Sequence, residues 1–342
     1  MLHFENDYNK GAHPALLEAL VALNDVGLSG YGTDEYSQSA VDKIRQATAC
    51  PQAEVTFLTG GTQANQVVIA ALLASYEGVI AADTGHIAVH EAGAIEYSGH
   101  KVLTLPHQDG KLEATAVRQF LETFYADANH EHMVFPGMVY ISHPTEYGTL
   151  YSKQELSELA RVCRDYQIPL FLDGARLGYA LAARATDLDL QTIAELTDVF
   201  YIGGTKMGAL IGEAVVFTKQ NQPKHFISIV KQHGALLAKG RLTGIQFDRF
   251  FTDDLYLELG KHAIEMAEQL IALLEEKGYR FYLQSPTNQQ FLLVTAEDLE
   301  KLDKAEVCYG FWEKYDETYT IIRLATSWST SQADMDALAE VL

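Results

Sequence analysis

Cysteine is scarce in this chain, with three residues in 342: Cys50, Cys163 and Cys308. Their number is odd and their wide spacing matches no motif, which suits a reducing compartment. Proline is also sparse, with eight residues, and no Pro/Ser-rich linker, low-complexity tract or internal repeat divides the chain. Any domain boundary must therefore be inferred from the order of helices and strands.

Long apolar runs are missing as well. The most notable run, Val67 to Ala74, is far too short to cross a bilayer. The first seven residues lack the basic start and following apolar stretch that mark a secretory signal. Together with the cysteine pattern, these absences predict a cytoplasmic protein.

Positive charge is in short supply: 25 Lys and Arg stand against 46 Asp and Glu, for a net charge of −21. Such a chain repels phosphate backbones and anionic membranes, so neither nucleic acid nor a membrane is an expected partner. An anionic ligand must instead be bound by local cations or by backbone N–H groups.

Apolar residues make up 48% of the chain and charged residues 21%, as in an ordinary globular protein. Strand patterns alternate with helical patterns through the first two thirds of the chain. This alternation predicts an open α/β sheet, mainly parallel, whose ligands bind at the carboxyl ends of the strands. The expected strands are 55–58, 79–82, 101–105, 138–142, 169–172 and 198–202.

A long helical stretch from Thr243 to Glu276, interrupted near Thr252–Asp254, follows the last of these strands. After it the pattern changes to short strands around 279–283, 291–294 and 319–326 and a final helix from Ser331. At this length a second core is expected. We therefore predict a large domain at 1–254, including an N-terminal arm, and a small C-terminal α+β domain at 255–342.

Three short motifs follow strands of the predicted sheet. Gly60, Gly61, Thr62 and Gln63 form a strand-to-helix turn that suits a phosphate. Asp173 ends a buried strand and precedes Gly174-Ala175-Arg176, and Lys206 follows Gly203-Gly204-Thr205 after another apolar run. Each motif alone has a plain structural explanation: a Thr-capped turn, an Asp-Gly turn, or a lysine at a strand end.

The order of the three motifs resembles the threonine aldolase and β-eliminating lyase family of fold-type-I enzymes, which use pyridoxal 5′-phosphate (PLP). Asp173 to Arg176 match the family's Asp-Gly-Ala-Arg, and Thr205-Lys206 match its Ser/Thr-Lys. The segments around His86, Glu91 and Arg323 also resemble family motifs, so the likeness covers essentially the whole chain. It implies the aspartate-aminotransferase-like fold and PLP as the cofactor.

The resemblance assigns roles to individual residues. Lys206 is expected to bind PLP covalently, Asp173 to pair with the pyridine nitrogen, and His86 to stack on the ring. Asp173 would keep the ring protonated and so make it an electron sink. The cofactor site is expected to comprise Gly60, Gly61, Thr62, Gln63, His86, Asp173, Arg176, Thr205, Lys206, Lys239 and Arg241, and the substrate site Asn6, Tyr31, Glu146, Arg176 and Arg323.

Some of these residues are expected to act on another subunit. Gly30-Tyr31-Gly32 resembles a family loop that reaches a neighbouring active site, and Lys239-Gly-Arg241 resembles a stretch that binds phosphate across a dimer. The resemblance therefore implies a homo-oligomer, a dimer or a tetramer, with shared active sites. Solvated surface residues would explain the same letters.

One position departs from the family. Many threonine aldolases have a histidine near the substrate hydroxyl where this chain has Glu146. An ionised carboxylate accepts hydrogen bonds or acts as a base, whereas a neutral imidazole exchanges a proton. Glu146 therefore leaves open whether threonine itself, or a substrate with a larger or aromatic β-substituent, is used.

The predicted activity is cleavage of the Cα–Cβ bond of a β-hydroxy-α-amino acid to glycine and an aldehyde. Two alternatives are β-elimination from an aromatic or sulfur-bearing amino acid, and a PLP-binding protein without catalysis. His86 and His90, four residues apart, could also share a metal, but the His-Glu-x-x-His order of zinc enzymes is absent and no metal is predicted.

Overall fold

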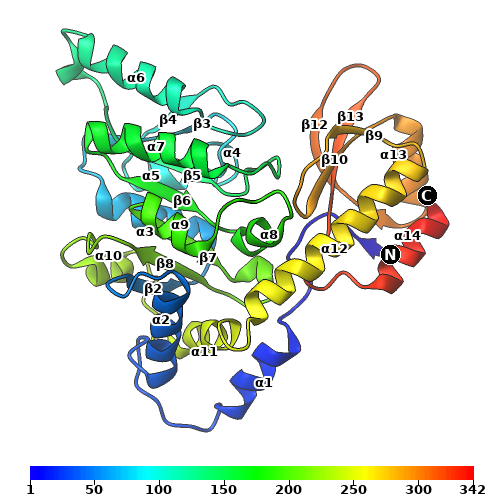
Figure 1. The fold of residues 1–342 in the computed structure, drawn as a ribbon, viewed down its shortest axis with the longest axis horizontal. Coiled ribbons are helices and arrows are strands. Elements are labelled where there is room, and N and C mark those ends of the chain that lie inside the picture. Colours follow the sequence, from blue (N-terminus) through cyan, green and yellow to red (C-terminus); the bar gives the residue numbers. More distant parts are fainter.

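The chain folds into a larger and a smaller unit that pack together (Figure 1). A sheet whose middle strands are buried on both faces lies at the centre of the larger unit. The computed structural model describes residues 1–342. β6, β7 and β8 are buried at every position, as strands between two layers of helices must be. Their sheet contains β2 (Glu54–Leu58), β3 (Glu77–Ala82), β4 (Val102–Leu105), β5 (Phe135–Ser142), β6 (Leu170–Asp173), β7 (Val199–Gly203) and β8 (Glu213–Phe217).

The strand order in this sheet is β2-β8-β7-β6-β5-β3-β4. Only β8 runs antiparallel to both of its neighbours, β2 and β7, and the other adjacent pairs are parallel. The prediction of a mainly parallel sheet is confirmed. Because β5, β6 and β7 run in the same direction, their carboxyl ends meet at one edge of the sheet.

Helices cover both faces of the large sheet and bury a separate apolar core on each. One core includes residues of α3 (Gly61–Leu72), α5 (Ala94–Tyr97) and α10 (Phe226–Gln232). The other includes residues of α2 (Glu35–Ala47), α6 (Ala114–Ala126), α7 (Lys153–Tyr166), α8 (Leu177–Ala182), α9 (Leu190–Leu196) and α11 (Arg241–Phe250). A capping box formed by Ser152 and Glu155 begins α7. Shorter or peripheral elements are α1 (Pro14–Ala22), α4 (His86–Val89) and the 3-10 turns His130–His132 and Thr205–Met207.

The smaller unit is an antiparallel sheet of four strands in the order β12-β13-β10-β9. Its strands are β9 (Arg280–Leu283), β10 (Gln289–Val294), β12 (Gly310–Lys314) and β13 (Thr320–Ala325). The parallel pair β1 (Leu2–His3) and β11 (Val307–Cys308) lies beside it, with α13 (Ala296–Lys304) and α14 (Gln332–Val341). Both termini lie in this unit (Figure 1).

Helix α12, Leu255–Glu276, connects the two units (Figure 1). Its first half packs closely on α8, where a Cβ on Gly260 would lie 2.4 Å from the carbonyl oxygen of Gly178. Its second half contributes Leu270 and Leu274 to the core of the smaller unit. The segment Thr252–Asp254 separates helix α11 from helix α12, where the sequence predicted an interruption.

The predicted division at 254/255 falls at the start of α12 and stays a proposal. The predicted large domain includes β1 and Phe4, but in the structure both pack with the smaller unit. None of the helices is both long and apolar enough to cross a membrane.

Candidate active site

A cavity of about 280 Å³ lies at the edge of the large sheet where β5, β6 and β7 end. Residues from all three sequence motifs line it. The structure brings nine predicted residues to this cavity: Gly60, Gly61, Thr62, His86, Glu146, Asp173, Arg176, Thr205 and Lys206.

Asp173, the last residue of β6, is 3% exposed and is surrounded by hydrogen-bond donors. Its Oδ2 accepts from the hydroxyl of Tyr140 at 2.6 Å and from Nδ2 of Asn65 at 3.0 Å, and its Oδ1 accepts from the hydroxyl of Tyr201. Burial alone would raise the pKa of Asp173, but the charge of His86 and these hydrogen bonds hold it below the usual value. The cavity therefore presents a fixed, ionised carboxylate.

Lys206 is the only lysine that lines this cavity, and its Nζ makes no hydrogen bond or ion pair within the chain. Burial, followed by the charge of Arg176, lowers the pKa of Lys206 to about 8. A substantial fraction of the amine is then uncharged near neutral pH and can act as a nucleophile.

Glu213 is a member of the cavity that the sequence did not indicate. This first residue of β8 is 3% exposed and accepts a hydrogen bond from the backbone N–H of Gly204 at 3.0 Å. Burial raises the pKa of Glu213 to about 8. The carboxyl group thus fixes the loop that carries Lys206 without adding a full negative charge beside it.

His86 is oriented by a chain of buried polar groups that leads back to Asp173. Its Nδ1 lies 2.7 Å from Oε1 of Glu91, and the same oxygen accepts a hydrogen bond from Nδ2 of Asn65 at 2.7 Å. Asn65 also donates to Asp173. The Nδ1 side of the ring is therefore held by Glu91, while His86 lines the cavity.

The predicted phosphate turn lies at the start of α3. Gly60 caps the helix without a side-chain hydrogen bond, so the first N–H groups of α3 are left free for a ligand. A Cβ on Gly61 would lie 3.0 Å from the hydroxyl oxygen of Tyr201. Gln63 does not line the cavity, because its Oε1 accepts from the N–H and hydroxyl of Thr59 and so orders the turn.

Arg176 is already engaged by a residue that the sequence did not indicate. Its Nε and Nη2 donate to the two carboxylate oxygens of Asp7 at 2.7 and 3.0 Å. Burial alone would raise the pKa of Asp7, but the charge of Arg176 keeps it well below the usual value. The edge of Arg176 formed by Nε and Nη2 is therefore paired within the chain, and Nη1 is the end left free for a substrate carboxylate.

Arg323 lies on β13 and lines a neighbouring cavity. Its Nη1 donates to Oε1 of Gln289 at 3.0 Å and its Nη2 to the carbonyl oxygen of Glu5 at 2.8 Å. Its Nε is buried and has no partner. Burial and the charge of Arg176 lower the pKa of Arg323, so this cation would be stabilised by an anionic ligand.

The N-terminal arm passes over the cavity, but Asn6 is not the residue that faces it. The Oδ1 of Asn6 accepts from the backbone N–H of Tyr8 at 2.9 Å, and Asn6 lines neither cavity. Tyr8 lines both, with its ring centre 6.0 Å from Nζ of Lys206. The arm therefore contributes Asp7 and Tyr8.

Glu146 is 7% exposed and lines the cavity, so its carboxyl group does not point to bulk water. Its Oε1 accepts from the backbone N–H of His86 at 2.8 Å and from the hydroxyl of Ser142 at 2.6 Å. Burial raises the pKa of Glu146. The nearby His143 does not replace the family histidine, since it is fully buried and its Nδ1 accepts from the N–H of Tyr151.

Tyr31, Lys239 and Arg241 lie together but line neither this cavity nor the one beside Arg323. The backbone N–H of Tyr31 donates to the carbonyl oxygen of Ala238 at 3.1 Å, beside the exposed Lys239. Nη1 of Arg241 donates to the carbonyl oxygen of Val26 at 2.9 Å. These residues can serve an active site only on another copy of the chain.

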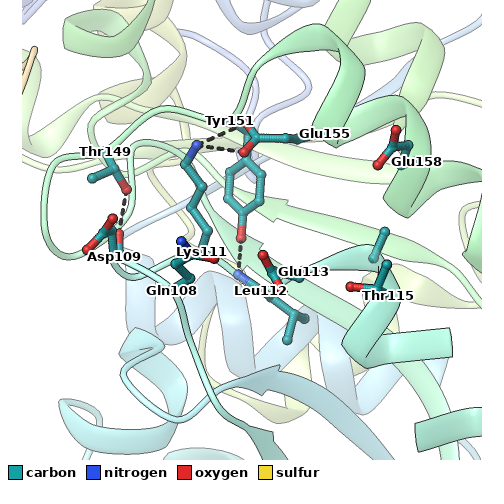
Figure 2. A pocket seen from close by; sticks show the side chains of 11 residues that line it. Gln108, Asp109, Lys111, Leu112, Glu113, Thr115, Thr149, Tyr151, Glu155 and Glu158 are labelled. Carbon is teal, nitrogen blue, oxygen red and sulfur yellow. Dashed lines mark hydrogen bonds and ion pairs between the residues drawn. The ribbon is translucent and has the colours of Figure 1, made fainter. Parts of the chain in front are cut away.

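A separate cavity of about 350 Å³ contains none of the predicted residues (Figure 2). Figure 2 shows Lys111 beside the ring of Tyr151, and its Nζ donates to both carboxylate oxygens of Glu155 at 2.8 and 2.9 Å. The hydroxyl of Tyr151 accepts from the N–H of Leu112. The lysine of this cavity is therefore paired with a carboxylate, unlike Lys206.

The residues present fit PLP. A helix start with free N–H groups suits its phosphate, the ionised Asp173 suits a protonated pyridine nitrogen, and the unpaired amine of Lys206 suits its aldehyde. The space that a side chain at Gly61 would fill is left open beside the hydroxyl of Tyr201.

Comparisons with known proteins agree with this geometry. The model of the β-eliminating lyase family matches residues 7–297. A low specificity L-threonine aldolase from Pseudomonas sp. (strain NCIMB 10558) is 30% identical, over 98% of this chain and 95% of its own. A threonine aldolase structure from Leishmania major is 40% identical, with a TM-score of 0.96 over 100% and 98% of the two chains. An aspartate aminotransferase from Thermus thermophilus, 16% identical over 100% and 92% of the two chains, shares the fold with a TM-score of 0.70.

Proposed function

The chain belongs to the β-eliminating lyase family, and from this membership we propose that it splits the Cα–Cβ bond of β-hydroxy-α-amino acids into glycine and an aldehyde. The family and the fold are PLP-dependent, so PLP is the cofactor we assign to the cavity. The observation that carries the proposal is the placement of the free amine of Lys206 in one cavity with the ionised Asp173, His86 and Arg176.

Each residue has a distinct task in this reaction. PLP, when bound, supplies the sink for the electron pair released from the Cα–Cβ bond. Asp173 holds a proton on the ring nitrogen, and the hydrogen bonds from Tyr140 and Asn65 keep its carboxylate in place. Arg323 and Nη1 of Arg176 bind the substrate carboxylate.

We assign His86 as the base that accepts the proton of the β-hydroxyl group. When the ring is uncharged, Nε2 is the nitrogen left to receive this proton, directly or through a water molecule, because Nδ1 lies against Glu91. Glu91 then stabilises the charged ring that results. Hydrogen bonds through Glu91 and Asn65 link His86 to Asp173. One network therefore positions both the proton acceptor and the carboxylate that pairs with the ring nitrogen.

Product analysis tests the proposal. The purified protein, supplied with PLP, is incubated with threonine, allo-threonine and phenylserine, and the products are identified. We expect glycine and the matching aldehyde in equal amounts. A 2-oxo acid with ammonia would indicate β-elimination instead, and no product from any of the panel would refute an aldolase.

Glu146 is proposed to select among β-substituents. Replacing it with glutamine keeps an acceptor for the N–H of His86 and the hydroxyl of Ser142 but removes the carboxylate. We expect the ratio of kcat/KM for phenylserine and threonine to change by roughly fivefold to a hundredfold, as one charged hydrogen bond allows. Because burial raises the pKa of Glu146, the wild-type ratio should vary with pH above 4.5, and that of Glu146→Gln should not.

Glu146→His restores the residue type of many threonine aldolases and serves as the matched variant. It should shift the ratio in a different direction or extent from Glu146→Gln on the same three substrates. Equal changes in kcat/KM on all three, in both variants, would mean that Glu146 has no part in selectivity.

We also propose that the protein is a homo-oligomer, a dimer or a homotetramer, as the family resemblance implies. Support comes from α1, where Leu17 is 40% exposed and Val21 is 74% exposed, and from the distance of Tyr31 and Arg241 from the chain's own cavity. Sedimentation should give a dimer or tetramer at assay concentration. An active monomer would overturn the proposal.

A variant test connects the assembly to the cofactor. Arg241→Ala should raise the dissociation constant for PLP on the order of tenfold, as loss of a charged hydrogen bond implies, although Arg241 lies outside its own subunit's cavity. Lys224→Ala, at an exposed surface lysine, is the control and should bind PLP normally.

The cytoplasmic location also stays a proposal, supported by three cysteines that form no disulfide.

A further inference from the structure

Three side chains that can bind a metal lie together where the N-terminal arm meets the smaller unit: His3, Glu5 and Cys308. Each offers one ligand atom, an imidazole nitrogen, a carboxylate oxygen or a sulfur, and these atoms all lie within 4.8 Å of one another. None of the three residues lines the cofactor cavity. The histidine pair weighed from the sequence, His86 and His90, is not part of this cluster.

The local backbone places the three side chains on one face. His3 and Cys308 are partners in the parallel pairing of β1 with β11. Phe4 and Val307, which adjoin them in the sequence, are buried in the core of the smaller unit. Because side chains alternate along an extended chain, His3, Glu5 and Cys308 point together away from that core.

The chain satisfies the polar groups of this cluster only in part. Nδ1 of His3 lies 3.0 Å from Oε1 of Glu5. The other oxygen of that carboxylate, Oε2, is buried and has no hydrogen-bond partner. Cys308 is half-buried and forms no disulfide. A buried carboxylate oxygen without a partner is costly, so the cluster contains a ligand atom whose partner the chain does not supply.

We propose that His3, Glu5 and Cys308 bind one zinc ion. Imidazole nitrogen, thiolate sulfur and carboxylate oxygen are the ligands that Zn²⁺ takes in proteins, and three of them leave the fourth tetrahedral position to water. Ligand atoms of such a site lie about 3.3–3.8 Å apart at the usual bond lengths. The present spacing of up to 4.8 Å therefore closes by rotation of the side chains.

A zinc ion here would fix the arm that reaches the active site. The carbonyl oxygen of Glu5 accepts a hydrogen bond from Nη2 of Arg323 at 2.8 Å. Two residues further on, Asp7 pairs with Arg176. The ion would join the arm to β11 immediately before these contacts, so its role is structural. No step of the proposed reaction passes through it, and the site goes beyond the proposed function.

The protonation of the thiol distinguishes the free site from the bound one. Burial, and then the charge of Glu5, raise the pKa of Cys308, so the free thiol keeps its proton near neutral pH. A metal-bound thiol is deprotonated. Zinc binding therefore releases this proton, and the thiolate and the carboxylate together balance the charge of Zn²⁺.

Zinc binding to the PLP-loaded protein tests the site. The protein is stripped of metal with EDTA and dialysed against zinc chloride, and zinc per chain is measured. We expect one bound ion, with a dissociation constant that rises in Cys308→Ser and in His3→Gln. The rise should exceed the roughly 10–100-fold that loss of an outer-shell partner costs. His132→Gln, at an exposed histidine outside the cluster, is the control and should bind zinc normally.

Alkylation of Cys308 locates the ion without any assay of turnover. The other two cysteines, Cys50 and Cys163, are buried, and labelled peptides are identified by mass spectrometry. Zinc should protect Cys308 from iodoacetamide in the wild type and in His132→Gln, and this protection should be lost in His3→Gln. Neither readout depends on glycine formation, so the outcome is separate from that of the aldolase assay. No zinc bound by the wild type, unchanged affinity in the two cluster variants, or no protection of Cys308 would each overturn the proposal.

Discussion

Replacing Asp173 with asparagine is expected to leave PLP bound and to lower kcat by about 10²–10³-fold, the range for loss of one preorganised electrostatic partner. An amide cannot hold a proton on the pyridine nitrogen as a carboxylate does. Asp173 is ionised in this site because hydrogen bonds and the charge of His86 outweigh its burial, which holds its pKa below the usual value. The loss should therefore appear in the chemical step and not in cofactor content.

Tyr140→Phe is the control for Asp173→Asn. It removes one of the hydroxyl groups that donate to Asp173 but keeps the carboxylate, so turnover should fall far less. PLP content is measured from visible absorption in both variants, and turnover is expressed per bound PLP. Near-normal turnover of Asp173→Asn with full PLP content would place the ring nitrogen elsewhere in the cavity.

The residues that the sequence identified correctly lie at the ends of buried strands. Asp173 ends β6, and Lys206 follows β7 after two glycines, so the apolar run before each residue marks its position. Because adjacent parallel strands end at the same edge, local patterns were enough to predict that these side chains meet. The break between α11 and α12 was predictable for the same reason, since Thr252–Asp254 interrupt a helical pattern locally.

The residues that the sequence did not identify depend on contacts between distant segments. Asp7 pairs with Arg176 across 169 positions, and no local pattern distinguishes it from other acidic residues. Glu213 begins β8, which was not among the expected strands although Ala214 to Phe217 is a short apolar run like those of β6 and β7. Its place between β2 and β7 depends on the antiparallel pairing of β8 with both.

Trp312 illustrates the same limit in the smaller unit. β12 was not predicted, because its residues Gly310 to Lys314 show partial burial and no run of apolar residues. Trp312 lines the cavity beside Arg323 only because the smaller unit packs on the larger, where its ring lies near Tyr147 and Arg323. A sequence pattern carries no information on such an arrangement of two units.

Lys206→Ala is expected to abolish the visible absorption of covalently bound PLP and to lower turnover by about 10³-fold or more, as removal of an essential nucleophile does. No other lysine lines either cavity, so none can take its place. The pKa of about 8 leaves the wild-type amine reactive near neutral pH. Lys111→Ala, at a lysine paired with Glu155 in the separate cavity of Figure 2, should keep both absorption and activity.

The most direct test of the PLP assignment is reduction of the wild-type holoprotein with borohydride, followed by peptide mapping of the labelled lysine. Borohydride fixes the bond between PLP and the protein, so the labelled residue is identified independently of activity. We expect a single labelled peptide that contains Lys206 and no label in Lys206→Ala. Label on another lysine, or label that persists in Lys206→Ala, would show that PLP is bound elsewhere.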